Sequence, residues 1–175
     1  MDGIDSATRL QLEALSQVAT ALAAAGFEYW VYGGWAVDLY AGRVTRPHFD
    51  VDFAVWLADL PGIRRLLQDL GFEHAPDPEE DGGTGFERAG VRLELTFLEP
   101  GEGGNVMIPM RQGLAVFSPG PIPYETRSLV GATCRVMGLQ SLARGKSHPR
   151  DDPDDARKDR ADNAVLQQLG IPSDS

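Results

Sequence analysis

Hydrophobic and polar residues alternate in patterns that predict both helices and strands. From residue 6 to 25, apolar residues recur at helical spacing, which predicts an amphipathic helix that Ser6 caps and Gly26 ends. The aromatic and β-branched run 27–32 predicts a strand, and residues 35–42 predict a short helix directly after it. Residues 49–56 alternate with a period of two, which predicts a strand with one apolar and one polar face.

The remaining pattern predicts further strands and three more helices. A helix is expected from Pro61 to Leu70, followed by an acidic, glycine- and proline-rich loop over 73–85. Residues 85–100 predict a hairpin that turns at Ala89 and Gly90, and a second hairpin is expected around Gly131. Within 99–124 only a short strand at 106–110 is expected, and the last two helices are expected at 139–144 and 154–169. This order predicts an α+β fold, a small mixed β-sheet packed by helices.

Length, composition and charge narrow the class of protein. The 175 residues suit a single domain, 1–175, with a core over about 1–136 and a C-terminal helical segment over about 137–175. A net charge of −10 argues against a nucleic-acid binder and suits either a cationic small molecule or solubility alone. Cys134 is the single cysteine, and no apolar run is long enough to span a membrane, so we expect a soluble, cytoplasmic protein without disulfides or membrane contact.

Two carboxylates share the polar face of the strand at 49–56. Because Asp50 and Asp52 are two residues apart, both side chains point the same way and repel each other unless a positive group joins them. Hard carboxylate oxygens suit Mg²⁺, which also binds substrate phosphates. The alternative is an ordinary strand with one solvent-facing side.

Three further features favour a site for metal and phosphate. Glu94 lies on the polar face of a later strand, so three carboxylates converge if the two strands are neighbours. Gly33 and Gly34 lie at a strand-to-helix turn, where backbone amides can approach a phosphate. Just before the aspartates come polar side chains suited to a polyphosphate: Arg43, Thr45 and Arg46.

The combination resembles the nucleotidyltransferase superfamily of DNA polymerase β. The string YWVYGGWAVDLYAGRVTRPHFDVD, residues 29–52, is similar to small antibiotic nucleotidyltransferases, the lincosamide and aminoglycoside 2″-adenylyltransferase types. The residues that match their motif are Gly33, Gly34, Trp35, Asp38, Gly42, Arg43, Arg46, His48, Asp50 and Asp52. RLELTF places Glu94 at the family's third carboxylate, where Asp is common, and ARKDRADNAVL resembles the C-terminal segment through Lys158, Asp159 and Asp162.

The resemblance implies a fold, a reaction and roles for the residues. It implies the polymerase β-like nucleotidyltransferase fold and transfer of AMP, or another nucleoside monophosphate, from ATP or another NTP to a hydroxyl of an antibiotic. Asp50, Asp52 and Glu94 would be catalytic and would bind Mg²⁺, as two ions, with Glu94 as the base. The nucleotide would be bound by Gly33, Gly34, Thr45, Arg46 and Lys158.

Several alternatives remain open from the sequence. The acceptor could instead be a protein or RNA, as in toxin–antitoxin systems, or the fold could bind nucleotide without turnover. The acidic loop at 77–81, with Glu99 and Glu102, suits a cationic aminoglycoside, whereas the motif at 29–52 matches the lincosamide enzymes equally well. The sequence leaves open the base preference, the modified hydroxyl and the oligomeric state.

Overall fold

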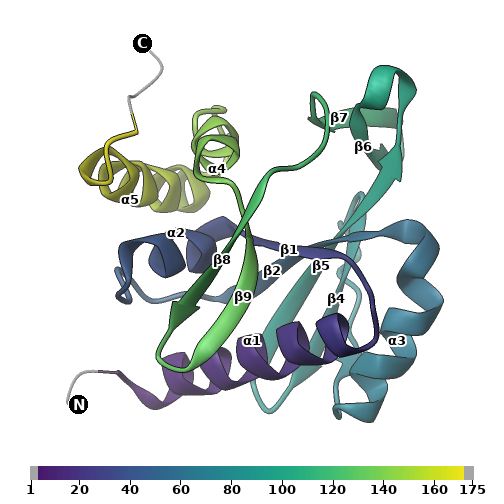
Figure 1. Ribbon diagram of the computed structural model, residues 1–175, viewed down its shortest axis with the longest axis horizontal. Coiled ribbons are helices and arrows are strands. Elements are labelled where there is room, and N and C mark those ends of the chain that lie inside the picture. Colours follow the sequence, from purple (N-terminus) through teal and green to yellow (C-terminus); the bar gives the residue numbers. More distant parts are fainter. Residues whose placement is uncertain (1–3, 172–175) are drawn as a thin grey trace.

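The computed structural model describes residues 4–171 and consists of one mixed sheet with helices on both sides (Figure 1). The ends of the predicted domain, 1–3 and 172–175, lie outside the described residues. The helices are α1 Ser6–Ala24, α2 Gly33–Ala41, α3 Leu60–Asp69, α4 Leu139–Lys146 and α5 Pro153–Gln168. The strands are β1 Tyr29–Tyr32, β2 Asp50–Trp56, β3 Glu73–His74, β4 Gly83–Arg88, β5 Val91–Pro100, β6 Val106–Met110, β7 Gly113–Ser118, β8 Tyr124–Leu129 and β9 Ala132–Met137.

The main sheet has the strand order β3-β4-β5-β2-β1-β9-β8. Strand β2 lies at its centre, parallel to β5 and antiparallel to β1, and β1 is parallel to β9. The end of β5 continues into a separate antiparallel ribbon with β6 and β7. The predicted α+β class, with a mixed sheet packed by helices, is confirmed.

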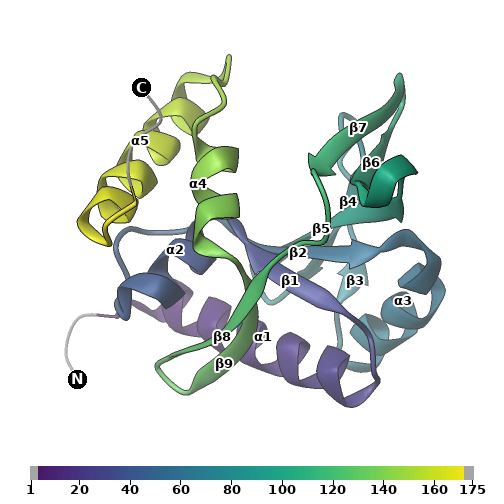
Figure 2. The ribbon, with the colours of Figure 1, turned by 45° about the horizontal axis from the view of Figure 1, so that its top comes forward.

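Helices cover the sheet unequally. α1 and α3 lie along one side, and α4 and α5 rise from the other (Figure 1). In Figure 2, α4 and α5 lie to one side of β1 and β2, and β6 and β7 lie to the other side. The strands β1 and β2 are therefore flanked by the helices α4 and α5 and by the β6–β7 ribbon. None of the helices over residues 4–171 combines the length and the hydrophobicity that a membrane span requires.

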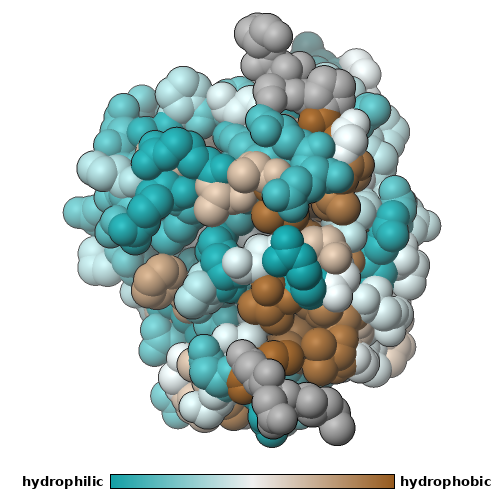
Figure 3. Space-filling model, turned by 90° about the vertical axis from the view of Figure 1, so that its left-hand side faces the viewer, coloured by the Kyte–Doolittle hydropathy of each residue, from teal (hydrophilic) through white to brown (hydrophobic). Residues whose placement is uncertain are grey.

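The core forms between α1, α3 and the sheet. Val51, Phe53 and Val55 of β2 are fully buried, as the alternation of residues 49–56 predicted. Ala54 on the other face is buried as well, and Phe49, expected beside the apolar residues, is 71% exposed because β2 starts only at Asp50. The face that carries α5 is largely hydrophilic, with hydrophobic residues gathered toward its lower half (Figure 3).

Three local predictions were wrong. The loop expected over 73–85 contains the short strand β3, and β4 begins within it at Gly83. Asp5, not Ser6, caps α1, since its carboxylate accepts the backbone N–H of Thr8. β7 was not predicted, because most of its side chains are exposed and the run 113–118 lacks alternation. The turn at Ala89 and Gly90 joins β4 and β5 as expected.

Candidate active site

Three carboxylates share one region of the sheet, as the sequence predicted. β2 and β5 are parallel neighbours, and their register pairs Asp52 with Glu94 and Asp50 with Arg92. Residues in register on adjacent strands point to the same face, so Asp50, Asp52 and Glu94 lie on one face. Within residues 4–171, the carboxylates of Asp50 and Asp52 have neither a hydrogen-bond partner nor an ion-pair partner.

The electrostatics of this face favour a cation. Burial, and after it the negative charge of Asp50, raise the pKa of Asp52 to about 8, whereas the charge of Lys146 opposes the shift. Burial also raises the pKa of Glu94, although the hydrogen bond from Arg92 opposes the shift. Two repelling, unpaired carboxylates bind a divalent cation well, because the cation removes the repulsion and supplies the missing partner.

Glu94 is less free than the two aspartates. Arg92 Nε lies 2.5 Å from Glu94 Oε1, and Arg92 also donates to Glu87 and to the backbone carbonyl of Ala75. In this arrangement no group of three or more His, Cys, Asp or Glu side chains of residues 4–171 is placed to hold a metal ion. Asp50 and Asp52 therefore fit a divalent cation by their chemistry, and the share of Glu94 in a metal site stays a prediction.

The two glycines allow close packing around the aspartates. Gly33 begins α2 with φ of 69°, a left-handed conformation that favours glycine, and a Cβ there would overlap the Asp52 carboxylate. A Cβ at Gly34 would lie 2.6 Å from His48 Nδ1 and would overlap the Arg46 guanidinium. Both glycines therefore bring the start of α2 against the residues of the site.

Much of the motif upstream of the aspartates is structural. The carboxylate of Asp38, fully buried in α2, accepts a hydrogen bond from Thr45 Oγ1 and lies 2.6 Å from His48 Nε2. The rings of Trp35 and His48 pack with centroids 4.5 Å apart. These contacts hold the loop 43–49 against α2. They also direct the Thr45 hydroxyl to Asp38, so the predicted contact of Thr45 with nucleotide finds no support in its geometry.

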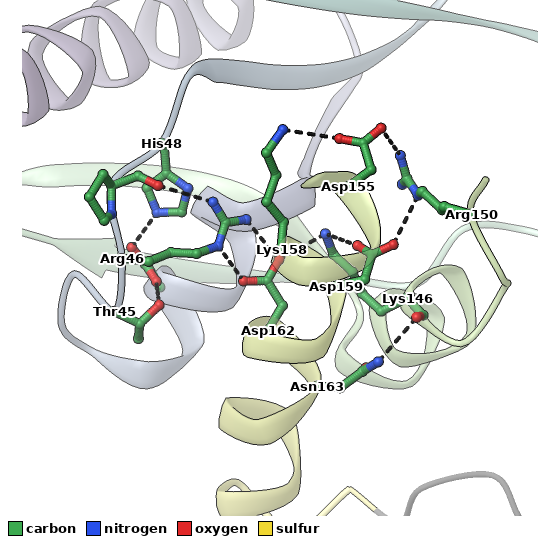
Figure 4. Close-up of polar contacts among 12 residues, drawn as sticks. Thr45, Arg46, His48, Lys146, Arg150, Asp155, Lys158, Asp159, Asp162 and Asn163 are labelled. Atoms are coloured by element: carbon green, nitrogen blue, oxygen red, sulfur yellow. Dashed lines mark hydrogen bonds and ion pairs between the residues drawn. The ribbon is translucent and has the colours of Figure 1, made fainter. Parts of the chain in front are cut away.

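A network of ion pairs joins this loop to α4 and α5 (Figure 4). Arg46 donates to both carboxylate oxygens of Asp162, at 2.8 and 2.9 Å, and Lys146 Nζ lies 2.8 Å from the same carboxylate. Lys146 and Arg150 each lie 2.9 Å from an oxygen of Asp159. Positive and negative side chains therefore alternate across the gap between the loop and the two helices.

Lys158 joins the outer part of this network. Its Nζ lies 3.0 Å from Asp155 Oδ1 and 4.9 Å from the centroid of the Phe49 ring. Lys158 therefore lies beside the residue that precedes Asp50, although the two are more than 100 residues apart in sequence.

These elements surround a cavity of about 740 Å³. It brings together most of the predicted site residues: Gly33, Gly34, Arg46, Asp50, Asp52 and Lys158. Thr45, Glu94 and the acidic loop at 77–81 are not among the lining residues. The sequence reasoning missed three cations on its α4–α5 side, namely Arg144, Lys146 and Arg150. The density of basic residues over 144–158 was the available signal.

Comparisons with known proteins agree with the fold and the motif. A family model described as aminoglycoside-2″-adenylyltransferase matches residues 14–140. A 2″-aminoglycoside nucleotidyltransferase from Klebsiella pneumoniae is 38% identical over 55 residues, which span 31% of this chain and 28% of that relative.

Two solved structures show the same fold. One is the lincosamide antibiotic adenylyltransferase LnuA with lincomycin bound, at a TM-score of 0.67 and 15% identity over 87% of this chain and 96% of that one. The other is ANT(2″)-Ia in complex with adenylyl-2″-tobramycin, at a TM-score of 0.61 and 18% identity over 93% of this chain and 99% of that one. The fold class is thus that of nucleotidyltransferases, and the family match covers more than half of the sequence. The chain belongs to the aminoglycoside-2″-adenylyltransferase family.

Proposed function

We propose that the protein transfers a nucleoside monophosphate, AMP from ATP in the first instance, to a hydroxyl of a small-molecule antibiotic, an aminoglycoside or a lincosamide. One observation carries this proposal: Asp50 and Asp52, without protein partners, line the same cavity as cations from the loop 43–49 and from α4 and α5. A metal-bound triphosphate needs this combination, carboxylates for the metal and cations for the phosphates. The relatives of known fold are named for adenylyl transfer to antibiotics, which supports the choice of acceptor.

Each residue has a role in the proposed reaction. Arg46, Lys146 and Lys158 would hold the phosphate oxygens, each exchanging a contact with its carboxylate partner for one with phosphate. Asp50 and Asp52, joined by Glu94, would hold Mg²⁺, expected as two ions, and bound metal would neutralise charge on the triphosphate. The start of α2 at Gly33 and Gly34 would present backbone amides to a phosphate.

The reaction conserves atoms and charge in a single displacement. The acceptor hydroxyl oxygen forms a bond to the α-phosphorus, and the bond from that phosphorus to the bridging oxygen of pyrophosphate breaks. Glu94 takes the hydroxyl proton, and pyrophosphate leaves with its charge held by the cations on α4 and α5. Arg92 contacts Oε1 of Glu94, so Oε2 would be the oxygen that accepts the proton.

The test is nucleotidyl transfer followed by mass spectrometry. The protein is incubated with Mg²⁺, each NTP in turn and a panel of antibiotics, with total cell protein as an alternative acceptor. We expect an antibiotic whose mass increases by one nucleoside monophosphate, together with pyrophosphate release. Asp50→Asn and Asp52→Asn should each abolish transfer without unfolding the protein, whereas Asp69→Asn, at an exposed position in α3, serves as the control.

Two results would contradict the proposal. Wild-type activity in Asp50→Asn and Asp52→Asn would remove the metal role of these residues. Modification of cell protein with no antibiotic modified would assign the same chemistry to a protein acceptor.

A further inference from the structure

The two walls of the cavity differ in chemistry. On the side of α4 and α5 the lining is cationic, through Arg144, Lys146, Arg150 and Lys158. On the side of β7 and the segment after it the lining is mainly apolar, through Val116, Phe117, Pro119 and Ile122. The walls lie on opposite sides of β1 and β2 (Figure 2). A ligand with a phosphate chain and a ligand with an apolar face would therefore bind different sides.

The strand order assigns these sides to the two substrates. Across the sheet, β5 with Glu94 lies on one side of β2, and β1 and β9 lie on the other. β5 continues into the β6–β7 ribbon, so the apolar wall lies on the side of the expected base. β9 leads directly into α4, so the cationic wall lies on the opposite side of Asp50 and Asp52. Glu94 itself lies outside the cavity lining, but its strand lies on the β6–β7 side of β2, so an acceptor hydroxyl that faces Glu94 would lie on the side of the apolar wall.

The apolar wall is accessible rather than part of the core. Val116 is 59% exposed, and Phe117 is half-buried with its ring edge-to-face on Tyr32, centroids 6.0 Å apart. Ile122 is largely buried and also lines the cavity. Large apolar side chains exposed at a cavity indicate a surface that an apolar part of a ligand covers.

The carboxylates that line the cavity do not provide binding positions for a polycation. Asp155 and Asp159, which line the cavity, are paired with Lys158, Lys146 and Arg150. The acidic loop at 77–81 is not part of the lining, and its residues Asp77, Glu80 and Asp81 accept hydrogen bonds from the loop backbone, Thr84 and the backbone of Arg111. Of the residues described, Asp50 and Asp52 are the only carboxylates in the lining without an ion-pair partner, and the metal would use both.

We propose that Val116, Phe117 and Ile122 form the acceptor subsite, and that the acceptor is a hydroxyl compound with an apolar face and at most one positive charge, rather than a polycation. This inference rests on the proposed function, because it names the class of the acceptor for the same reaction. The acidic loop then has a structural role and no direct contact with the acceptor.

The test compares two exposed positions of β7. Val116→Ser removes apolar surface from the cavity wall, and Leu114→Ser makes a similar change two residues away, at a position that is 57% exposed and outside the lining. We expect Val116→Ser to raise KM for a lincosamide about three- to tenfold, the effect of losing one to two buried methyl groups. Its KM for ATP and its kcat should stay near wild type, and Leu114→Ser should change neither KM.

The acceptors and a binding measurement separate this inference from the proposed function. Lincomycin represents the weakly charged class, and tobramycin represents the polycations. Binding of each is measured by calorimetry with Mg²⁺ and a non-hydrolysable ATP analogue, alongside transfer from ATP. If Val116→Ser weakens lincomycin binding and Leu114→Ser does not, the subsite is supported, even if no transfer is observed. The absence of transfer would overturn only the proposed function.

Other outcomes overturn the inference. Transfer to tobramycin with a higher kcat/KM than to lincomycin would leave the proposed function intact and refute the acceptor class. Equal binding of lincomycin by wild type, Val116→Ser and Leu114→Ser would refute the subsite. Binding of neither compound would refute it as well.

Discussion

The carboxylate of Asp162 should contribute strongly to stability, since it joins α5 to the rest of the site. Its side chain is fully buried. It accepts hydrogen bonds from Nε and Nη2 of Arg46 and lies beside the Lys146 ammonium, with all three nitrogens within 2.9 Å of a carboxylate oxygen. Asp162→Asn keeps the shape but removes the charge and one of the two acceptor oxygens. We expect the variant to fold with a lower free energy of unfolding.

The structure sets the size of this loss. Removing one partner of a buried ion pair costs about 3–5 kcal/mol, because the remaining charge stays buried without compensation. Here the cost should be somewhat smaller, about 2–4 kcal/mol, since Lys146 keeps Asp159 and the Asn carbonyl still accepts from Arg46. The side chain of Arg46 is also 16% exposed, so water can solvate part of its charge.

The pH dependence gives an independent check on the cause. Burial alone would raise the pKa of Asp162, but the hydrogen bonds from Arg46 and the charge of Lys146 outweigh it and hold the pKa below the usual 3.8. A carboxyl whose pKa is lower in the folded state stabilises the protein above its unfolded pKa and loses that contribution as the pH falls through the folded pKa. The difference between wild type and Asp162→Asn should therefore be constant from pH 6 to 8 and shrink below pH 3.8.

Urea denaturation followed by tryptophan fluorescence measures this difference. The dependence of the free energy on urea should be unchanged, so that only the midpoint moves. Asp69→Asn, an exposed position in α3, controls for a general effect of losing a negative charge. A loss for Asp162→Asn within about 0.5 kcal/mol of this control, the range of ordinary surface substitutions, would refute the reasoning. So would a difference that persists unchanged at pH 3.

Three further predictions concern the strands and the start of α2. Because burial and the charge of Asp50 raise the pKa of Asp52 to about 8, the metal-free protein should lose stability relative to Asp52→Asn as the pH rises from 4 to 8, by up to about 5 kcal/mol in urea denaturation. The same difference between the two proteins at pH 4 and pH 9 would contradict this. Gly34→Ala should destabilise the protein by about 1–3 kcal/mol, because the added Cβ would overlap His48. Gly145→Ala, where a Cβ meets nothing within 4 Å, should not destabilise it. Equal melting temperatures for the two variants would show that the loop 43–49 moves to accommodate the Cβ. Glu94→Gln should lower kcat by about two to four orders of magnitude with little change in stability, and a loss below tenfold would assign the base to another group.

Local sequence predicted most of the elements and the paired aspartates. The spacing of Asp50 and Asp52 fixes them on one face of any strand, and the alternation of Val91, Leu93 and Leu95 likewise fixes Glu94 on the polar face of its strand. The hairpin turn at 89–90 was also predicted from neighbouring residues, because Ala89 and Gly90 separate two strand-like runs. These features depend on backbone geometry that a few neighbouring residues determine.

The partners of charged side chains did not follow from the sequence. Arg46 was expected to bind phosphate, and in the structure it binds Asp162, which is 116 residues away. Thr45 is directed to Asp38, and Arg92, given no role from the sequence, binds the Glu94 carboxylate. A charged side chain can reach several partners, and which one it meets depends on how α5 and the neighbouring strands pack.

Local patterns in the sequence therefore predicted most of the strands and helices, the shared face of Asp50 and Asp52, and the family. Tertiary structure alone decided that β2 and β5 are parallel neighbours in register, which brings Glu94 beside Asp52. It also decided that Lys146 and Val116 line opposite walls of one cavity, while the acidic loop at 77–81 lies outside the lining. The physical reason is that short-range patterns fix the direction of a side chain within its element, whereas the packing of distant elements fixes what that side chain faces.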